Sequence, residues 1–239
     1  MRLIVFSDVH ANLPALKAIH SAIQTDGYDL AIHTGDVLAI GPSPAECLDL
    51  LLNLPRTRLI MGNHDAYFAF GIPQPLPAYI SEGEYQHQLW THRQLDPRLS
   101  PVVAEWPYLI EQDFEDVATT FFHYEINETG DDFVPVIRRP SAEDLDQLFA
   151  HHRSKLLFFG HDHDASDIAG RIRYVNPGSA GCFSGAVARY AVVDYSKGSY
   201  SIEYREAPYD DAELYREFEQ RHVPERNFIY QTFFGGRFS

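Results

Sequence analysis

The chain has 239 residues, of which 45% are hydrophobic and 22% charged; this is typical of a large globular domain and excludes a disordered or collagen-like chain. Acidic residues outnumber basic ones by 34 to 19, and the resulting net charge of −15 disfavours long nucleic acid as a partner. The chain contains two cysteines, Cys47 and Cys182, which argues against a disulfide scaffold and favours a cytoplasmic location.

The first apolar run, Leu3 to Phe6, soon meets the carboxylate of Asp8. It is therefore too short for the core of a signal peptide, and we expect a strand. The sequence contains neither an uninterrupted run of eighteen apolar residues nor a basic amphipathic segment. We therefore expect no membrane-spanning helix and no attachment to a membrane surface.

Short runs of branched and aromatic residues recur along the chain and are typical of buried strands that lead into polar loops. The expected strands are Leu3 to Phe6, Leu30 to His33, Arg58 to Met61, Thr119 to Phe122 and Lys155 to Phe159. Between them, Asn12 with Pro14 and Ser43 with Pro44 mark the starts of helices. This alternation predicts an α/β fold whose parallel strands are covered by helices and whose ligands bind beyond the carboxyl ends of the strands.

A different pattern occupies residues 66–118, where three prolines precede a helix-compatible stretch from Glu82 to Leu95. We interpret this region as a helical insertion. Alternating runs at Ala188 to Val193 and Tyr200 to Tyr204 then predict a second sheet rich in hairpins. Because we find no repeat or linker, we expect a single domain over residues 1–239.

Metal-ligand side chains occur in four segments that each end a predicted strand. These segments are Asp8-Val9-His10, Gly35-Asp36, Gly62-Asn63-His64-Asp65 and Gly160-His161-Asp162-His163. Their carboxylates, amide and imidazoles suit divalent ions such as Mn²⁺, Fe or Zn²⁺. In an extended backbone, Asp8 and His10 project to the same side, as do His161 and His163. Each motif alone is more often a surface turn, but their joint occurrence favours a metal site.

Together with His123, these motifs resemble those of the calcineurin-like metallophosphoesterase superfamily. The resemblance extends to Asn176-Pro177-Gly178-Ser179 and to the stretch from Leu89 to Leu95, and it is strongest for small bacterial phosphodiesterases similar to YfcE. It implies a four-layer α/β/β/α sandwich with a pair of mixed sheets and a metal site at the rim formed by the carboxyl ends of the strands.

The resemblance also implies two divalent transition-metal ions, with Mn²⁺ favoured and Fe, Zn²⁺ and Ni²⁺ as alternatives. The implied ligands are Asp8, His10 and His163 for the first ion, Asn63, His123 and His161 for the second, and Asp36 as the bridge. The carboxylate of Asp36 is suited to this role because a carboxylate can span two cations, and paired ions are a recurrent device of phosphate chemistry.

The implied activity is hydrolysis of small phosphate mono- or diesters, including nucleotides, by in-line attack of a hydroxide that bridges the two ions. The alternative is a non-catalytic scaffold for protein interaction that retains the fold. Such relatives usually lose the proton-donating histidine or several ligands, and this sequence has lost none of them. The enzyme is therefore the favoured hypothesis.

His64 and Asp65 are the predicted catalytic residues. His64 directly follows Asn63, so we expect its side chain to point away from the ligands. The resemblance implies that it stabilises the transition state or protonates the leaving group. Asp65 either orients His64 or caps the following helix, and the sequence leaves both roles open.

Several further residues carry open interpretations. In many relatives a glycine follows the residue that matches His123, whereas Tyr124 stands here. His33 lies inside a predicted strand, and we expect a hydrogen-bonded core residue. The turn from Asn176 to Gly181 either presents amides to a phosphate or simply connects strands. Five aromatic residues either stack on a substrate base or pack in the core: Tyr67, Phe68, Tyr79, Tyr85 and Phe234.

Overall fold

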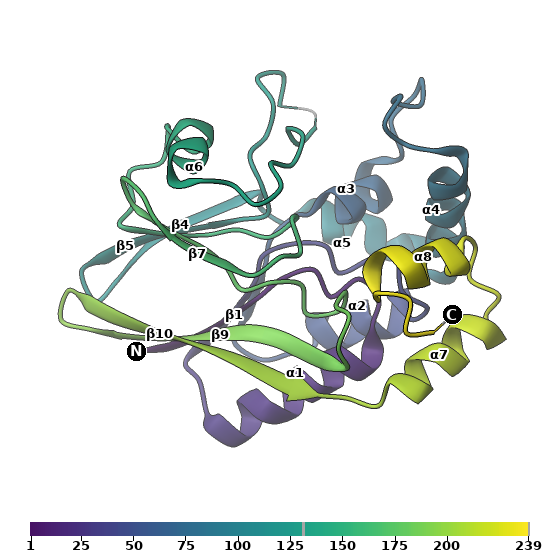
Figure 1. The fold of residues 1–239 in the computed structure, drawn as a ribbon, viewed down its shortest axis with the longest axis horizontal. Coiled ribbons are helices and arrows are strands. Elements are labelled where there is room, and N and C mark those ends of the chain that lie inside the picture. Colours follow the sequence, from purple (N-terminus) through teal and green to yellow (C-terminus); the bar gives the residue numbers. More distant parts are fainter. Residues whose placement is uncertain (131, 239) are drawn as a thin grey trace.

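Two five-stranded sheets face each other in the computed structural model, which describes residues 1–130 and 132–238 (Figure 1). The first sheet has the order β10-β9-β1-β2-β3. Its strands are β1 (Arg2–Phe6), β2 (Leu30–His33), β3 (Thr57–Leu59), β9 (Val187–Ser196) and β10 (Ser199–Pro208). Strands β1, β2 and β3 are parallel, whereas β9 is antiparallel to β1. The loops that follow the three parallel strands therefore meet at one edge of the sheet.

The second sheet has the order β4-β5-β6-β8-β7. Its strands are β4 (Leu109–Phe114), β5 (Val117–Phe122), β6 (Leu156–Phe158), β7 (Ser166–Ala169) and β8 (Arg173–Asn176). Here β5, β6 and β8 are parallel, with Thr119 opposite Leu156 and Leu156 opposite Arg173. The sheet is mixed because β4 and β7 are antiparallel edge strands.

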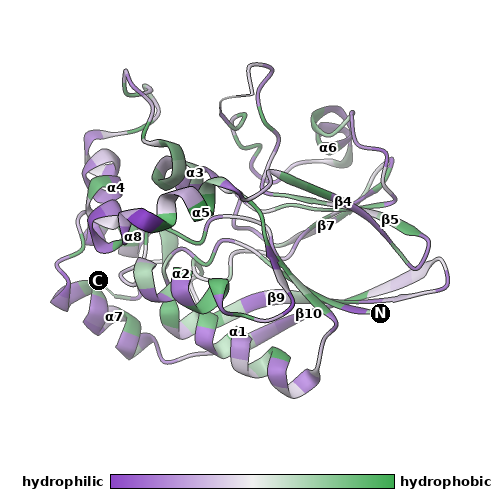
Figure 2. Ribbon diagram, turned by 180° about the vertical axis from the view of Figure 1, so that it is seen from behind, coloured by the Kyte–Doolittle hydropathy of each residue, from purple (hydrophilic) through white to green (hydrophobic). Residues whose placement is uncertain are grey.

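Helices cover the outer faces of both sheets and complete the four layers. Helices α1 (Leu13–Asp26) and α2 (Pro44–Leu52) pack on the first sheet, and α6 (Ala142–Leu148) packs on the second. Hydrophobic and hydrophilic residues mix along α1, as expected of a helix with one buried side (Figure 2). Between the sheets, Val5 and Ile32 pack with Phe121 and other apolar side chains. The predicted α/β/β/α architecture is confirmed.

The helix starts follow the residues expected from the sequence. Asn12 accepts the backbone N–H of Ala15 at the start of α1. Ser43 precedes α2, although its side chain makes no capping hydrogen bond there. A further helix start, not among those named above, is that of α7 (Asp211–Gln220), where Asp210 accepts the N–H of Ala212.

Two expectations about the course of the chain were wrong. The hairpin of β9 and β10 extends the first sheet beside β1 rather than forming a second sheet. The helical region between β3 and β4 ends at Ala104 rather than near residue 118, because residues 109–114 form strand β4. This region contains α3 (Asn63–Phe70), α4 (Glu82–Gln94), the 3₁₀ helix η1 (Pro97–Leu99) and α5 (Ser100–Ala104).

The aromatic end of the chain contains a helix that the sequence did not predict, α8 (Arg226–Phe233). Its residues Ile229 and Tyr230 are buried with Phe234 against Leu214 and Phe218 of α7. Figure 1 shows α8 between α4 and α7. The end of the chain thus lies beside the helical region that follows β3. Among the described residues, no helix is both long enough and apolar enough to cross a membrane.

Candidate metal centre

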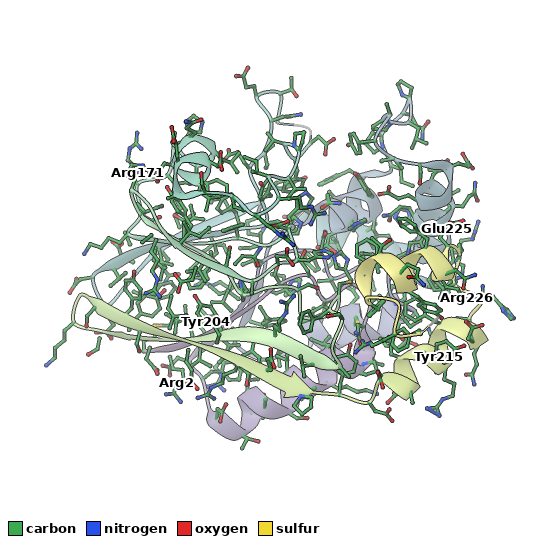
Figure 3. The ribbon with its side chains drawn as sticks, in the orientation of Figure 1. Arg2, Arg171, Tyr204, Tyr215, Glu225 and Arg226 are labelled. Atoms are coloured by element: carbon green, nitrogen blue, oxygen red, sulfur yellow. The ribbon has the colours of Figure 1, made fainter. Side chains whose placement is uncertain are left out.

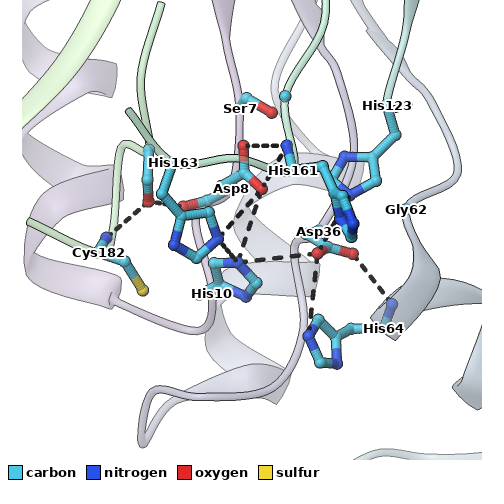
Figure 4. Close-up of polar contacts among 12 residues, drawn as sticks. Ser7, Asp8, His10, Asp36, Gly62, His64, His123, His161, His163 and Cys182 are labelled. Carbon is cyan, nitrogen blue, oxygen red and sulfur yellow. Dashed lines mark hydrogen bonds and ion pairs between the residues drawn. The ribbon is translucent and has the colours of Figure 1, made fainter. Parts of the chain in front are cut away.

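One group of ligand side chains gathers around Asp8, in the loop after β1. The Nε2 atoms of His10 and His163 lie 2.9 Å apart, and they lie 3.7 and 3.5 Å from Oδ1 of Asp8. All three side chains point into one space (Figure 4). The structure thus brings together the three residues expected to hold the first ion.

A second group lies beside the first. Nε2 of His123 is 3.2 Å from Oδ1 of Asn63 and 3.2 Å from Nδ1 of His161. His123 directly follows β5, Asn63 is the first residue of α3, and His161 follows β6. Although Tyr124 replaces the glycine of many relatives, its ring packs on His161 with centroids 5.0 Å apart and leaves His123 facing the group.

Asp36 lies between the two groups. Its Oδ2 is 3.8 Å from Nε2 of His10 in the first group and 3.3 Å from Nε2 of His123 in the second. The side chain is almost completely buried. This position between the groups is the one that a bridging carboxylate requires.

The backbone of the ligand loops is strained. Five ligand residues have positive φ angles between 46° and 68°: Asp8, His10, Asp36, His161 and His163. Such conformations cost about 1–3 kcal/mol each and cluster at functional sites. They also show that the geometric reason given for the ligand pairs was wrong. Asp8 and His10 converge through left-handed turns, and so do His161 and His163, rather than through an extended backbone.

Close backbone approaches hold these loops together. Asp8 N–H donates to the carbonyl of Gly35, and His10 N–H donates to that of Asp36. A Cβ atom on Gly62 would lie 2.2 Å from Oδ1 of Asp36, and one on Gly160 would lie 2.7 Å from Oδ2 of Asp8. Glycine is therefore required at both positions to let the carboxylates take their places.

The turn from Asn176 to Gly181 supports the ligand loops. Ser179 donates from its hydroxyl to the carbonyl of Asp8, and its backbone N–H donates to that of His163. Asn176 donates from its side-chain amide to the carbonyl of Gly160, and Gly181 N–H donates to the carbonyl of Asp8. These amides are occupied by protein partners, which favours the structural interpretation of this turn over phosphate binding.

His161 and His163 are neutral imidazoles that suit metal binding, whereas His123 holds a proton that a bound cation would have to displace. Burial lowers the pKa of His163 to about 3 and that of His161 to about 4, so both imidazoles are neutral at pH 7. Burial opposes ionisation of Asp8, but its hydrogen bond to His10 and the charges of nearby histidines outweigh burial and lower its pKa. Burial likewise opposes the charge on His123, yet Asp36 raises the pKa of His123 to about 9.

The donor set fits two divalent cations. Two adjoining groups of side chains each present imidazole nitrogens together with carboxylate or amide oxygens. This mixture of nitrogen and oxygen ligands suits divalent transition metals such as Mn²⁺, Fe and Zn²⁺. Nδ1 of His10 lies 3.2 Å from the carbonyl of Leu38, and when it donates there, Nε2 of His10 is left free to bind a cation. Cys182 also lies close, since one ligand atom each from His10, His163 and Cys182 fall within 4.8 Å of one another.

His64 does not point away from the cluster as expected. Its Nε2 is 4.0 Å from Oδ2 of Asp36, and its ring meets that of His10 edge to face at 5.3 Å. The reason is that Asn63 begins a helix, so successive side chains diverge by about 100° rather than by 180°. The other ring nitrogen, Nδ1, contacts the side-chain amide nitrogen of Gln88 on α4.

Of the two roles left open for Asp65, the structure supports the one at the start of the following helix. Its buried carboxylate accepts hydrogen bonds from the backbone N–H groups of Asp36, Val37 and Leu38 at 2.8–3.2 Å. It also accepts the N–H of Gly62, the residue before α3, at 3.2 Å. Asp65 thus stabilises the start of α3 and positions the loop that carries Asp36.

A cavity of about 440 Å³ opens onto the metal-facing side chains. Asp36, Asn63, His161 and His163 line one part of it, and Arg138 lies at its wall. Arg138 donates to the carbonyl and the carboxylate of Asp162 at 2.8 Å. The sequence did not single out Arg138 or Gln88, because neither belongs to a motif and both reach the site through tertiary packing.

Of the five aromatic residues named from the sequence, two pack in the core, two line the cavity, and the half-buried Tyr85 of α4 does neither. Phe68 and Phe234 are core residues, whereas Tyr67 and Tyr79 line the cavity beside the ligands. His33 is buried as expected, but neither of its ring nitrogens has a hydrogen-bond partner among the described residues. The expectation of a hydrogen-bonded core histidine was therefore wrong.

Fold and site together define the class: a two-sheet α/β protein whose strand ends carry a histidine- and aspartate-rich cluster of candidate metal ligands. The family model of the calcineurin-like phosphoesterase superfamily domain matches residues 1–198. The chain belongs to this superfamily, and the resemblance of its motifs is confirmed.

Three proteins are similar to this chain over nearly its full length. An uncharacterized protein of Methanocaldococcus jannaschii is 25% identical over 250 residues, with 98% of this chain and 97% of the relative covered. A hypothetical protein from Pyrococcus horikoshii OT3 has a similar crystal structure, with a TM-score of 0.80, 16% identity and coverage of 98% and 97%. A metallophosphoesterase from Sphaerobacter thermophilus gives a TM-score of 0.68, 22% identity and coverage of 94% and 95%.

Proposed function

We propose that this protein is a two-metal phosphoesterase that hydrolyses small phosphate mono- or diesters. The observation that carries this proposal is the place of Asp36, whose Oδ2 lies between His10 of one ligand group and His123 of the other. Asp8, His10 and His163 would hold one ion, and Asn63, His123 and His161 the other. Such ions supply Lewis acidity to the phosphoryl oxygens and a nucleophile at neutral pH.

His64 is the proton donor in this proposal. Burial lowers its pKa to about 4, so the imidazole is neutral at pH 7 and carries one proton. Because the amide nitrogen of Gln88 donates to Nδ1, that proton resides on Nε2, which faces Asp36 and the metal-facing cavity. From there it can be delivered to the oxygen of the leaving alcohol as the bond to phosphorus breaks, and a proton of the attacking water then restores the neutral imidazole.

The other residues fix the place of the reacting group. Asp65 holds the loop that carries Asp36 through backbone hydrogen bonds. Arg138 offers a guanidinium at the cavity wall that can face an anionic ester.

We further infer one domain over residues 1–239. The buried free thiols of Cys47 and Cys182 support a reducing compartment such as the cytoplasm.

Hydrolysis of bis-p-nitrophenyl phosphate, p-nitrophenyl phosphate and a panel of nucleotides by Mn²⁺-loaded protein tests this proposal. We expect turnover by the wild type and a large loss in Asp36→Ala. Equal background rates for both proteins would rule out catalysis. The non-catalytic scaffold would then gain support from elemental analysis that finds under one equivalent of transition metal, with no response to added Mn²⁺.

A further inference from the structure

A second cavity, of about 420 Å³, lies next to the metal-facing one, and none of the proposed metal ligands lines it. The two cavities share five lining residues: Ile40, His64, Tyr79, Glu84 and Phe233. His64 therefore stands where the cavities join. An alcohol whose oxygen meets Nε2 of His64 in the metal-facing cavity can extend into the second cavity past the side chains that both cavities share.

Aromatic side chains form much of the wall of this cavity. Phe228 and Phe233 come from α8, and Tyr79 comes from the segment before α4. Phe228 is 60% exposed and Tyr79 is 61% exposed, which is unusual for large apolar side chains next to a functional site. These faces are available to a ligand.

The charge of the cavity is negative. Glu84 and Glu225 line it, and no lysine or arginine is found among its lining residues in the described part of the chain. Glu225 stands at the start of α8, on the side of α4 (Figure 3). A Cβ atom on Gly83 would lie only 2.8 Å from Cδ of Glu225, so this glycine allows the Glu225 side chain to lie against α4.

Unpaired acceptors belong to the same cavity. Oε1 of Gln88 and Nε2 of His87 are buried and have no hydrogen-bond partner among the described residues. Both side chains line the cavity and are at most 5% exposed. Their lone pairs add partial negative charge to the wall of the cavity, which favours a positively charged ligand.

We propose that this cavity binds the alcohol part of the ester and selects a cationic amino alcohol. Aromatic faces and carboxylates together favour an ammonium group. An alcohol that carries a further phosphate would meet two carboxylates and no balancing cation. This inference rests on the proposed function. In the step concerned, water oxygen bonds to phosphorus, the bond from phosphorus to the alcohol oxygen breaks, His64 gives that oxygen its Nε2 proton, and the proton that the water loses restores the neutral imidazole of His64.

Three methyl phosphodiesters test the proposal: those of choline, of its neutral isostere 3,3-dimethylbutanol, and of the anionic 3-sulfopropanol. ³¹P NMR identifies which alcohol leaves. We expect release of methyl phosphate from the choline diester with a kcat/KM about tenfold above that of the isostere, and the slowest turnover for the anion. In the Glu84→Gln/Glu225→Gln double variant this preference disappears. The matched control Glu82→Gln, at an exposed position of α4 outside the cavity, keeps it.

The outcomes separate this proposal from the phosphoesterase proposal itself. Hydrolysis of bis-p-nitrophenyl phosphate without any preference by charge overturns the amino-alcohol site and leaves the phosphoesterase proposal standing. A protein that hydrolyses none of the esters contradicts the proposed function. In that case, calorimetric titration with tetramethylammonium tests the cavity without turnover. We expect binding that the double variant lacks, and absence of binding to the wild type refutes the site.

Discussion

Replacement of His33 by leucine should make the protein more resistant to acid. His33 is fully buried at the end of β2, and burial lowers its pKa from 6.5 to about 3. At a pH between about 3 and 6.5, His33 binds a proton in the unfolded chain but not in the folded chain. The free energy of unfolding therefore falls as the pH falls through this range. At pH 5 this linkage costs about 2 kcal/mol, whereas at pH 7 it costs only about 0.2 kcal/mol.

The assay is urea unfolding of wild type and His33→Leu at pH 7 and pH 5, with chelator present so that metal binding does not contribute. Titration of the ligand histidines is common to both proteins and cancels in the difference. The stability advantage of the variant should grow by about 2 kcal/mol from pH 7 to pH 5. Phe6→Leu, which changes the ring 5.1 Å from His33 without removing a titratable group, is the control. A difference between His33→Leu and wild type that does not depend on pH would refute the argument.

Two further predictions concern the site. Gln88→Leu removes the donor to Nδ1 of His64 and should lower kcat for alkyl phosphodiesters about 10- to 100-fold, but much less for p-nitrophenyl esters, whose leaving group needs no proton. Equal losses for both kinds of ester would speak against the positioning role of Gln88. Gly62→Ala places Cβ 2.2 Å from Oδ1 of Asp36 and should weaken Mn²⁺ binding, measured by calorimetry, while circular dichroism shows a folded protein. Wild-type affinity for Mn²⁺ in this variant would contradict the geometry described for Asp36.

Much of the architecture could be predicted because local signals and tertiary structure agree. Asn12 and Pro14 mark the start of α1, and the strands at residues 3–6 and 30–33 form where branched apolar residues cluster. The hairpin of β9 and β10 was assigned to the wrong sheet because an alternating pattern indicates a strand but not the strand with which it pairs. Pairing with β1 is decided by long-range contacts that no local pattern contains.

The ligand cluster was predicted from motifs at the ends of strands, and the structure brings all seven of these side chains together. The sequence could not define how they converge, since the positive φ angles of Asp8 and His161 depend on the surrounding loops. The partner of His64 was also missed. Gln88 lies 24 residues further along the chain on a helix whose packing against α3 is set by tertiary structure.

Counting bound metal most directly tests the central claim that two groups of ligands share Asp36. Metal-free wild type and Asp36→Asn would be dialysed against Mn²⁺, and the bound metal would be measured by elemental analysis. The account predicts two ions per wild-type chain together with hydrolysis of bis-p-nitrophenyl phosphate, and fewer ions without hydrolysis in the folded variant. A folded wild-type protein that binds one ion or none, or a variant that still binds two and remains active, would contradict it.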